Sequence, residues 1–147
     1  MASNKKKAEQ LGLSMSADKV EEIKFVPPSA DELDSENEQQ MDDFNILMDN
    51  LSTTEEKVKS LWKQIYQNAL IDRRNSYILF GDLYNIVAGN ANEHGIHGNS
   101  LAKYLERMSK ANDQLIKLAE LVDAATHENE ETIFSDSNLY SQISKTS

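Results

Sequence analysis

An acid beside two arginines is the strongest candidate for chemistry in this sequence. Asp72 is followed directly by Arg73 and Arg74, the mixed charges that an active site often combines. Neither this cluster nor Asn112 has the neighbouring acid, base or nucleophile that catalysis needs. We interpret the cluster as a charged helix surface or as a buried polar layer that sets the register of packed helices, and Asn112 in the same way.

The histidines and the tryptophan are weaker candidates. His94 and His97 lie three residues apart, but a stable zinc site takes three or four protein ligands, so we expect both in a loop. Trp62 is expected in a hydrophobic core, and the alternative, a stacking platform for nucleic-acid bases, has only Lys59 and Lys63 as basic neighbours. No glycine-rich phosphate loop, HExxH pair or GxSxG elbow occurs. We expect no catalytic residue, metal site or cofactor.

Charge is concentrated at the two ends of the chain. The 147 residues carry a net charge of −10, to which residues 1–52 contribute −7 (five Lys, twelve acids) and residues 127–147 contribute −3 (one Lys, four acids). The neutral centre argues against wrapping a long nucleic-acid backbone, which requires a basic face. The absence of cysteine fits a reducing cytoplasm. No apolar run reaches the roughly 18 residues of a membrane span.

Two long helices are expected to position these residues. The first begins at Thr53, after a capping box formed by Ser52 and Glu55, and ends at Ala88-Gly89. Residues 89–100 are rich in glycine and asparagine and predict a connector, after which Asn99 or Ser100 caps the second helix. That helix, residues 101–125, repeats apolar residues every seven positions, which predicts pairing along a second helix. Its two rows are Leu101, Met108, Leu115 and Val122, and Tyr104, Ala111, Leu118 and Ala125.

The apolar face of residues 77–87 is too wide for one partner helix to cover. It needs either a lid helix or another copy of the chain, and we favour another copy. The packing or oligomer contacts that we predict are Trp62, Ile65, Leu79, Phe80, Leu83, Leu101, Leu105, Met108, Leu115, Leu118 and Val122.

The remaining segments are expected to be a lid helix and two disordered ends. Apolar residues spaced three or four apart predict a short amphipathic helix over about 38–50, as a lid or, alternatively, a partner-binding helix. Residues 1–37 are read as a disordered acidic arm, in which Phe25 and Val26 belong to a spacer or to a linear motif. Residues 127–147 are read as a disordered acidic tail. Its candidate docking residues are Leu139, Tyr140 and Ile143.

We therefore predict an all-α protein with three parts. A long antiparallel helical hairpin, coiled-coil-like, carries a short N-terminal helix and disordered acidic tails. The parts are the arm at 1–37, the hairpin and oligomerisation domain at 38–126, and the tail at 127–147.

The hairpin resembles the central hairpin of the small terminase subunit of T-even-like tailed phages. The resemblance covers about residues 73–122 and rests on Arg73-Arg74-Asn75, then on Leu105, Met108, Asn112 and residues 115–118 of the second helix. It implies a noncatalytic protein that oligomerises, engages viral DNA and regulates the large ATPase subunit during genome packaging. It also implies that the tails serve the DNA or the large subunit, in the cytoplasm of a host cell. Arg73, Arg74 and Asn112 are candidate register residues or DNA contacts.

Two other classes of function stay open. One is a small acidic adaptor that binds transcription or replication machinery as a monomer or dimer. The other is a virion structural or scaffold protein that uses the same pair of helices.

Overall fold

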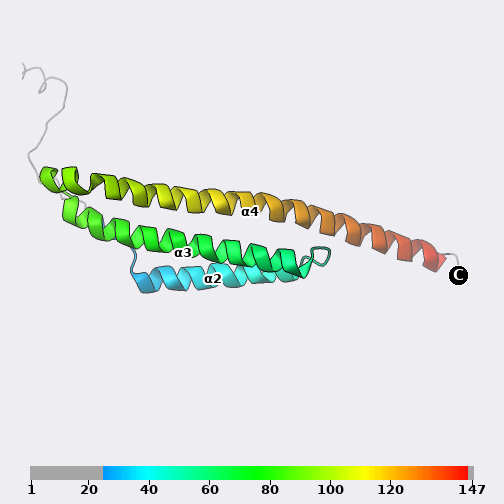
Figure 1. Cartoon of the computed structure of the whole chain (residues 1–147). Coiled ribbons are helices and arrows are strands. Elements are labelled where there is room, and N and C mark those ends of the chain that lie inside the picture. The colour runs from blue at the N-terminus through cyan, green and yellow to red at the C-terminus, as the bar shows by residue number, and fades with distance from the viewer. Residues whose placement is uncertain (1–24, 146–147) are drawn as a thin grey trace, which may run out of the picture.

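The protein is built from three helices that lie side by side (Figure 1). The computed structural model describes residues 25–145, so residues 1–24 of the predicted arm at 1–37 lie outside the described residues. The helices are α2 (Ala30–Asp49), α3 (Glu56–Val87) and α4 (Ala91–Lys145), and the described part contains no strand. The prediction of an all-α fold is confirmed. Both α2 and α4 pack on α3.

Helix α2 begins eight residues before the predicted start at residue 38. A capping box explains the difference, because Ser29 Oγ accepts from the Glu32 amide at 3.2 Å while Glu32 Oε2 accepts from the Ser29 amide at 2.8 Å. Residues 30–37 are therefore helical, and the prediction that they belong to a disordered arm is wrong.

The predicted capping box at the start of α3 does not form. The helix begins at Glu56, with Glu55 as an N-cap that makes no side-chain hydrogen bond. The hydroxyl of Ser52 instead donates to Asn129 Oδ1 of α4 at 2.8 Å. Ser52 thus tethers the α2–α3 connector to α4.

Helix α4 begins ten residues before the predicted start at residue 101. Asn90 Oδ1 accepts from the amides of Asn92 and Glu93 at 3.1 and 3.2 Å, which caps the new helix. The turn itself uses Gly89, whose φ of 78° favours glycine. The predicted connector over 89–100 is therefore wrong beyond residue 90, and His94 and His97 lie in the first turns of α4.

Helix α4 also continues far beyond the predicted end. It runs to Lys145, so the prediction of a disordered tail is wrong for residues 127–145. A helix that is already nucleated gains one backbone hydrogen bond for each residue added. In Figure 1 this last part of α4 projects past the α2–α3 connector, away from the other helices. We call residues 130–145 the α4 extension, and every residue in it is exposed.

The main hydrophobic core lies where all three helices meet, near the α2–α3 connector. The ring of Phe44 stacks on that of Tyr66, with centroids 4.2 Å apart and planes 6° from parallel. The buried members of this core are Phe44, Met48, Leu51, Trp62, Leu118 and Val122. Trp62 therefore lies in the core, as predicted.

Residues 25–28 cover part of the wide apolar face of α3. The ring of Phe25 makes edge contacts with Tyr77, Phe80 and Tyr84, at centroid distances of 6.1, 6.3 and 5.5 Å. We call residues 25–28 the N-terminal strap. The chain itself therefore covers these three rings in part, with Tyr84 still 38% exposed, and coverage of the rest of the face by another copy stays a prediction.

Candidate functional site

The charged cluster in the middle of α3 ties the three helices together. Arg74 makes a two-pronged ion pair with Asp34 of α2, with both N–O distances 2.7 Å. Asp72 accepts from Arg107 of α4 at 2.7 Å. Arg73 Nη2 donates to Gln40 Oε1 of α2 at 3.2 Å. The cluster thus makes cross-helix contacts to α2 and to α4, as a device that sets helix register would.

The ion pair also decides how far Arg74 can serve as a DNA contact. The hydrogen bond to Asp34 raises the pKa of Arg74 above its ordinary value, so the guanidinium stays charged. Its Nε and Nη2 donors are directed at that carboxylate. Arg74 would have to give up the pair to bind a phosphate.

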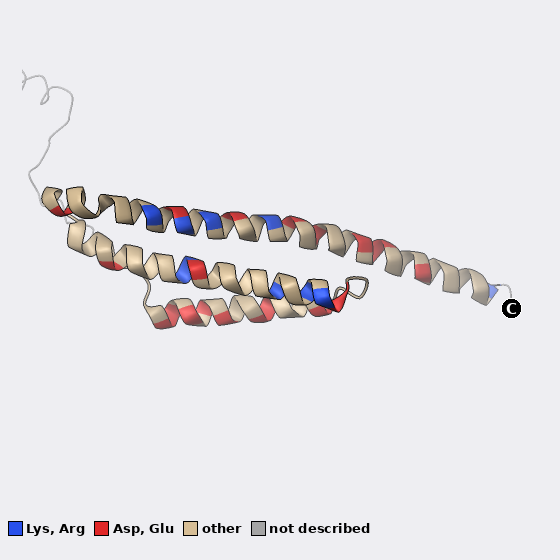
Figure 2. Ribbon diagram, in the orientation of Figure 1, with Lys and Arg blue, Asp and Glu red and all other residues tan. Residues whose placement is uncertain are grey.

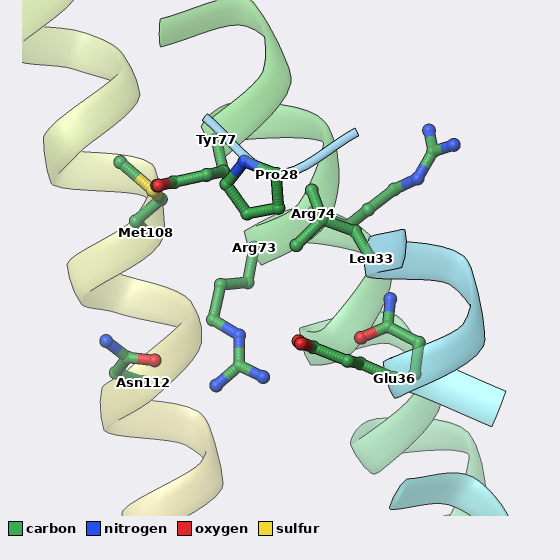
Figure 3. A pocket seen from close by; sticks show the side chains of 9 residues that line it. Pro28, Leu33, Glu36, Arg73, Arg74, Tyr77, Met108 and Asn112 are labelled. Atoms are coloured by element: carbon green, nitrogen blue, oxygen red, sulfur yellow. The ribbon is translucent and has the colours of Figure 1, made fainter. Parts of the chain in front are cut away.

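A hollow of about 320 Å³ lies beside this cluster, between α2, α3 and α4 (Figure 3). The guanidinium of Arg73 enters it from α3, Glu36 faces it from α2, and Asn112 borders it from α4. Because an arginine and a glutamate share this space, the hollow does not select an anion or a cation. Asn112 is exposed at its edge, not inside the pairing seam of α3 and α4.

The predicted packing residues divide by burial. Most lie in or beside the contact between α3 and α4, but two do not. Trp62, Leu101, Leu118 and Val122 are buried, Ile65, Phe80, Leu83, Met108 and Leu115 are half-buried, and Leu79 and Leu105 are exposed.

One buried polar residue that joins α4 to the α2–α3 connector was not predicted from the sequence. Asn129 of α4 is 7% exposed, and its Oδ1 accepts from the amides of Ser52 and Thr53 at 2.9 and 3.2 Å. Its Nδ2 donates to the carbonyl of Asn50 at 3.4 Å. The sequence does indicate that Asn129 is buried, because Asn129 is the next member of the heptad row that contains Leu115 and Val122.

A groove of about 450 Å³ runs between α3 and α4 on the side away from α2. Its lining comes from these two helices alone and includes Ile65 and Asp72 of α3 and Lys117 and Leu121 of α4. Leu121 is 54% exposed at its edge. Leu61 (54% exposed) and Leu79 (48% exposed) lie on the same side of α3, four residues before Ile65 and seven after Asp72. We call this surface the α3–α4 groove.

The docking residues predicted in the tail are all exposed on the α4 extension. Leu139, Tyr140 and Ile143 are helical and exposed, and in Figure 1 this end of α4 extends past α2 and α3. Leu139 and Ile143 continue the two heptad rows that pack on α3 earlier in α4, whereas Tyr140 continues the row of Asn112 at the edge of that face. The extension thus presents a continuation of the pairing face.

The histidines make only local contacts. His97 Nε2 lies 3.3 Å from Glu93 Oε2, and His127 Nε2 lies 3.7 Å from Asp123 Oδ1, each one helical turn away. Among the described residues, no three His, Cys, Asp or Glu side chains are grouped so that they could hold a metal ion. No helix in residues 25–145 is long and apolar enough to cross a membrane.

Comparisons with known protein families, with curated proteins and with solved structures find no match for this chain.

Proposed function

We propose that this chain is a noncatalytic assembly subunit whose helical body associates with other copies of itself. The observation that carries the proposal is the α3–α4 groove, where Leu61, Leu79 and Leu121 expose apolar surface along neighbouring helices. Apolar side chains gathered at a groove are typical of protein interaction sites. A second copy that covers them would remove this surface from water, which favours association.

The resemblance of residues 73–122 to small terminase subunits supports a specific role for the assembly. In this role α3 and α4 pair as an antiparallel, coiled-coil-like hairpin and form the oligomerisation unit. The assembly regulates the large ATPase of a phage packaging motor in the host cytoplasm. Self-association and engagement of the large subunit are the core of the proposal, because Arg74 is already paired with Asp34 and the net charge of −10 disfavours strong DNA binding.

The first test is the solution mass of the full chain, measured by light scattering over a concentration series. We expect a stable oligomer that Leu79→Asp converts to a monomer, because a carboxylate would be buried at the contact. Ile116→Asp is the matched control, since Ile116 is also exposed (58%) but lies two residues from the groove residue Gln114, on the opposite side of α4. A monomer at every concentration would refute the proposal.

The second test concerns the partner. The assembled chain is added to the large terminase ATPase of the same virus, and the rate of ATP hydrolysis is measured. We expect stimulation by the wild type and little by Leu79→Asp. Equal stimulation by the wild-type oligomer and the monomeric variant would show that assembly is not needed for regulation.

The α4 extension favours a second candidate function, a small acidic adaptor. Leu139, Tyr140 and Ile143 form an exposed surface that a larger protein would bind without any self-association. The light-scattering series separates the two functions. A monomer that still binds a larger protein through these residues would favour the adaptor.

A further inference from the structure

Helix α2 carries an acidic row on the side that faces away from its buried residues. The helix contains eight Asp and Glu residues and no Lys or Arg. Asp31, Glu38, Asp42 and Asp49 follow each other at intervals of seven, four and seven residues, so they share one side of α2, and all four are exposed. Within the described structure Glu38 and Asp42 make no ion pair. Asp49 makes a long one, with its Oδ1 3.4 Å from Lys63 Nζ. Ile46, 62% exposed, lies between the last two acids of this acidic row.

Helix α4 carries a basic row along the α3–α4 groove. Lys103, Lys110 and Lys117 lie seven residues apart, so they share one side of the helix. Lys117 lines the groove itself. In the part of the chain that the structure describes, Lys110 pairs with Glu106 at 2.7 Å, whereas neither Lys103 nor Lys117 makes an ion pair. The groove therefore has a basic edge with unused charges beside exposed leucines.

The acidic and basic rows cannot meet within one copy of the chain. Figure 2 shows the acids of α2 and the basic residues of α4 on opposite sides of α3. No α2 residue lines the α3–α4 groove, whereas the hollows on the other side of the molecule include Leu33 and Phe44 of α2. The two surfaces are available only to another molecule.

We infer that the acidic row of α2 in one copy docks on the α3–α4 groove of a second copy. The lengths agree, because residues 31–49 of α2 and residues 103–121 of α4 each contain nineteen residues, about 27 Å of helix from the first residue to the last. With the two helices parallel, Ile46 enters the groove beside Leu121, and the acids that precede Ile46 meet the lysines of α4, all of which precede Leu121. Complementary charge then favours this contact over a contact between the α2 helices of two copies, which are both acidic.

This inference rests on the proposed self-association and makes it specific. A contact between two different surfaces leaves one acidic row and one groove unoccupied at the ends of each pair. Further copies can therefore add in the same way, and the chain of contacts closes into a ring or continues as a filament.

Two charge-reversal variants test the contact without disturbing an ion pair inside one copy. The first is Glu38→Lys with Asp42→Lys, and the second is Lys103→Glu with Lys117→Glu. We expect each variant alone to raise the dissociation constant for self-association about tenfold or more, because like charges then face each other. An equimolar mixture should assemble again, since the intact acidic row of the second variant meets the intact groove of the first, and the reversed rows of the two variants meet as Lys against Glu. Circular dichroism checks that both variants stay helical.

Matched controls change the same number of charges elsewhere. Glu130→Lys with Glu131→Lys alters the α4 extension, and Lys5→Glu with Lys6→Glu alters residues outside the described part. We expect both controls to assemble as the wild type does. If the wild type assembles but either test variant assembles equally well, or if mixing does not restore assembly, this contact is wrong while self-association stands. If the wild type is monomeric, self-association itself fails.

Discussion

Asn129 is the residue that fixes α4 against the α2–α3 connector. Its carbonyl oxygen accepts hydrogen bonds from the amides of Ser52 and Thr53, and Asn129→Ala would leave both amides without a protein acceptor. Water replaces part of the loss because Ser52 and Thr53 are exposed. We expect the free energy of unfolding to fall by about 1–2 kcal/mol, as measured by urea denaturation.

Asn138→Ala is the matched control for this substitution. Asn138 lies on the same helix but in the exposed α4 extension, so we expect a change below about 0.5 kcal/mol. Equal effects of the two substitutions would show that the buried amide contributes nothing specific.

Some of these residues could be predicted from the sequence, and others could not. Ser29 and Glu32 have capping-box spacing directly after two prolines, and Asn129 continues a heptad row, so both signals were present. The bonds from Ser52 to Asn129 join residues 77 positions apart. No local pattern reports such a partner, which is why the Ser52 hydroxyl was assigned to a helix cap instead.

Gly81 is the contact point between α3 and the N-terminal strap. A Cβ added at Gly81 would lie 2.9 Å from Pro27 Cγ and 3.1 Å from Pro27 Cβ. The proline ring cannot turn aside, so Gly81→Ala should displace the strap and release Phe25 from its aromatic contacts. We expect weaker near-ultraviolet circular dichroism from the tyrosines and faster proteolysis near residue 25.

A second glycine in a helix provides the comparison. An added Cβ at Gly95 meets nothing within 4 Å, so Gly95→Ala should stabilise the protein by about 0.5–1 kcal/mol through helix propensity alone. Stabilisation by Gly81→Ala to the same extent, with the strap still in place, would contradict the proposed contact.

At the scale of elements, the helix boundaries were harder to predict than the helices themselves. The two heptad rows predicted in residues 101–125 agree with the observed packing of α4. Their buried members are Leu101, Ala111, Leu118 and Val122. The start of α4 crosses Gly95 and Gly98, each of which disfavours a helix interior by about 1 kcal/mol. The Asn90 cap and continuity with the packed part of α4 outweigh that local preference.

The α4 extension should be dispensable for the stability of the helical body. All its residues are exposed, so a chain that ends after Ile133 should unfold within about 0.5 kcal/mol of the full chain. A chain that ends after Thr126 lacks Asn129 and should lose about as much stability as Asn129→Ala. Thermal and urea unfolding of the two truncated chains measure the difference. A large loss in the longer one would mean that the extension folds back onto the body.

At the scale of the whole molecule, the shape explains why so much apolar surface stays exposed. Helix α4 has 55 residues, which corresponds to about 83 Å at 1.5 Å per residue. Helices α2 and α3 are shorter, with 20 and 32 residues, so they cannot cover it. A single copy therefore leaves part of the pairing face of α4 without a cover, and association with another chain is the direct way to bury it.

Salt distinguishes a charge-selected contact from a purely apolar one. If the acidic row of α2 docks on the lysines of the α3–α4 groove, raising the ionic strength from about 0.05 to 0.5 M should weaken self-association, because the screening length falls from about 14 to 4 Å. Salt also relieves the net repulsion between copies of charge −10 in either case, and we expect the loss of the close contacts between the two rows to outweigh that relief. Apolar burial alone would be unchanged or strengthened by salt. Sedimentation or light scattering over a salt series measures the dissociation constant. Tighter association at high salt would show that apolar contacts, and not the two charged rows, hold the copies together.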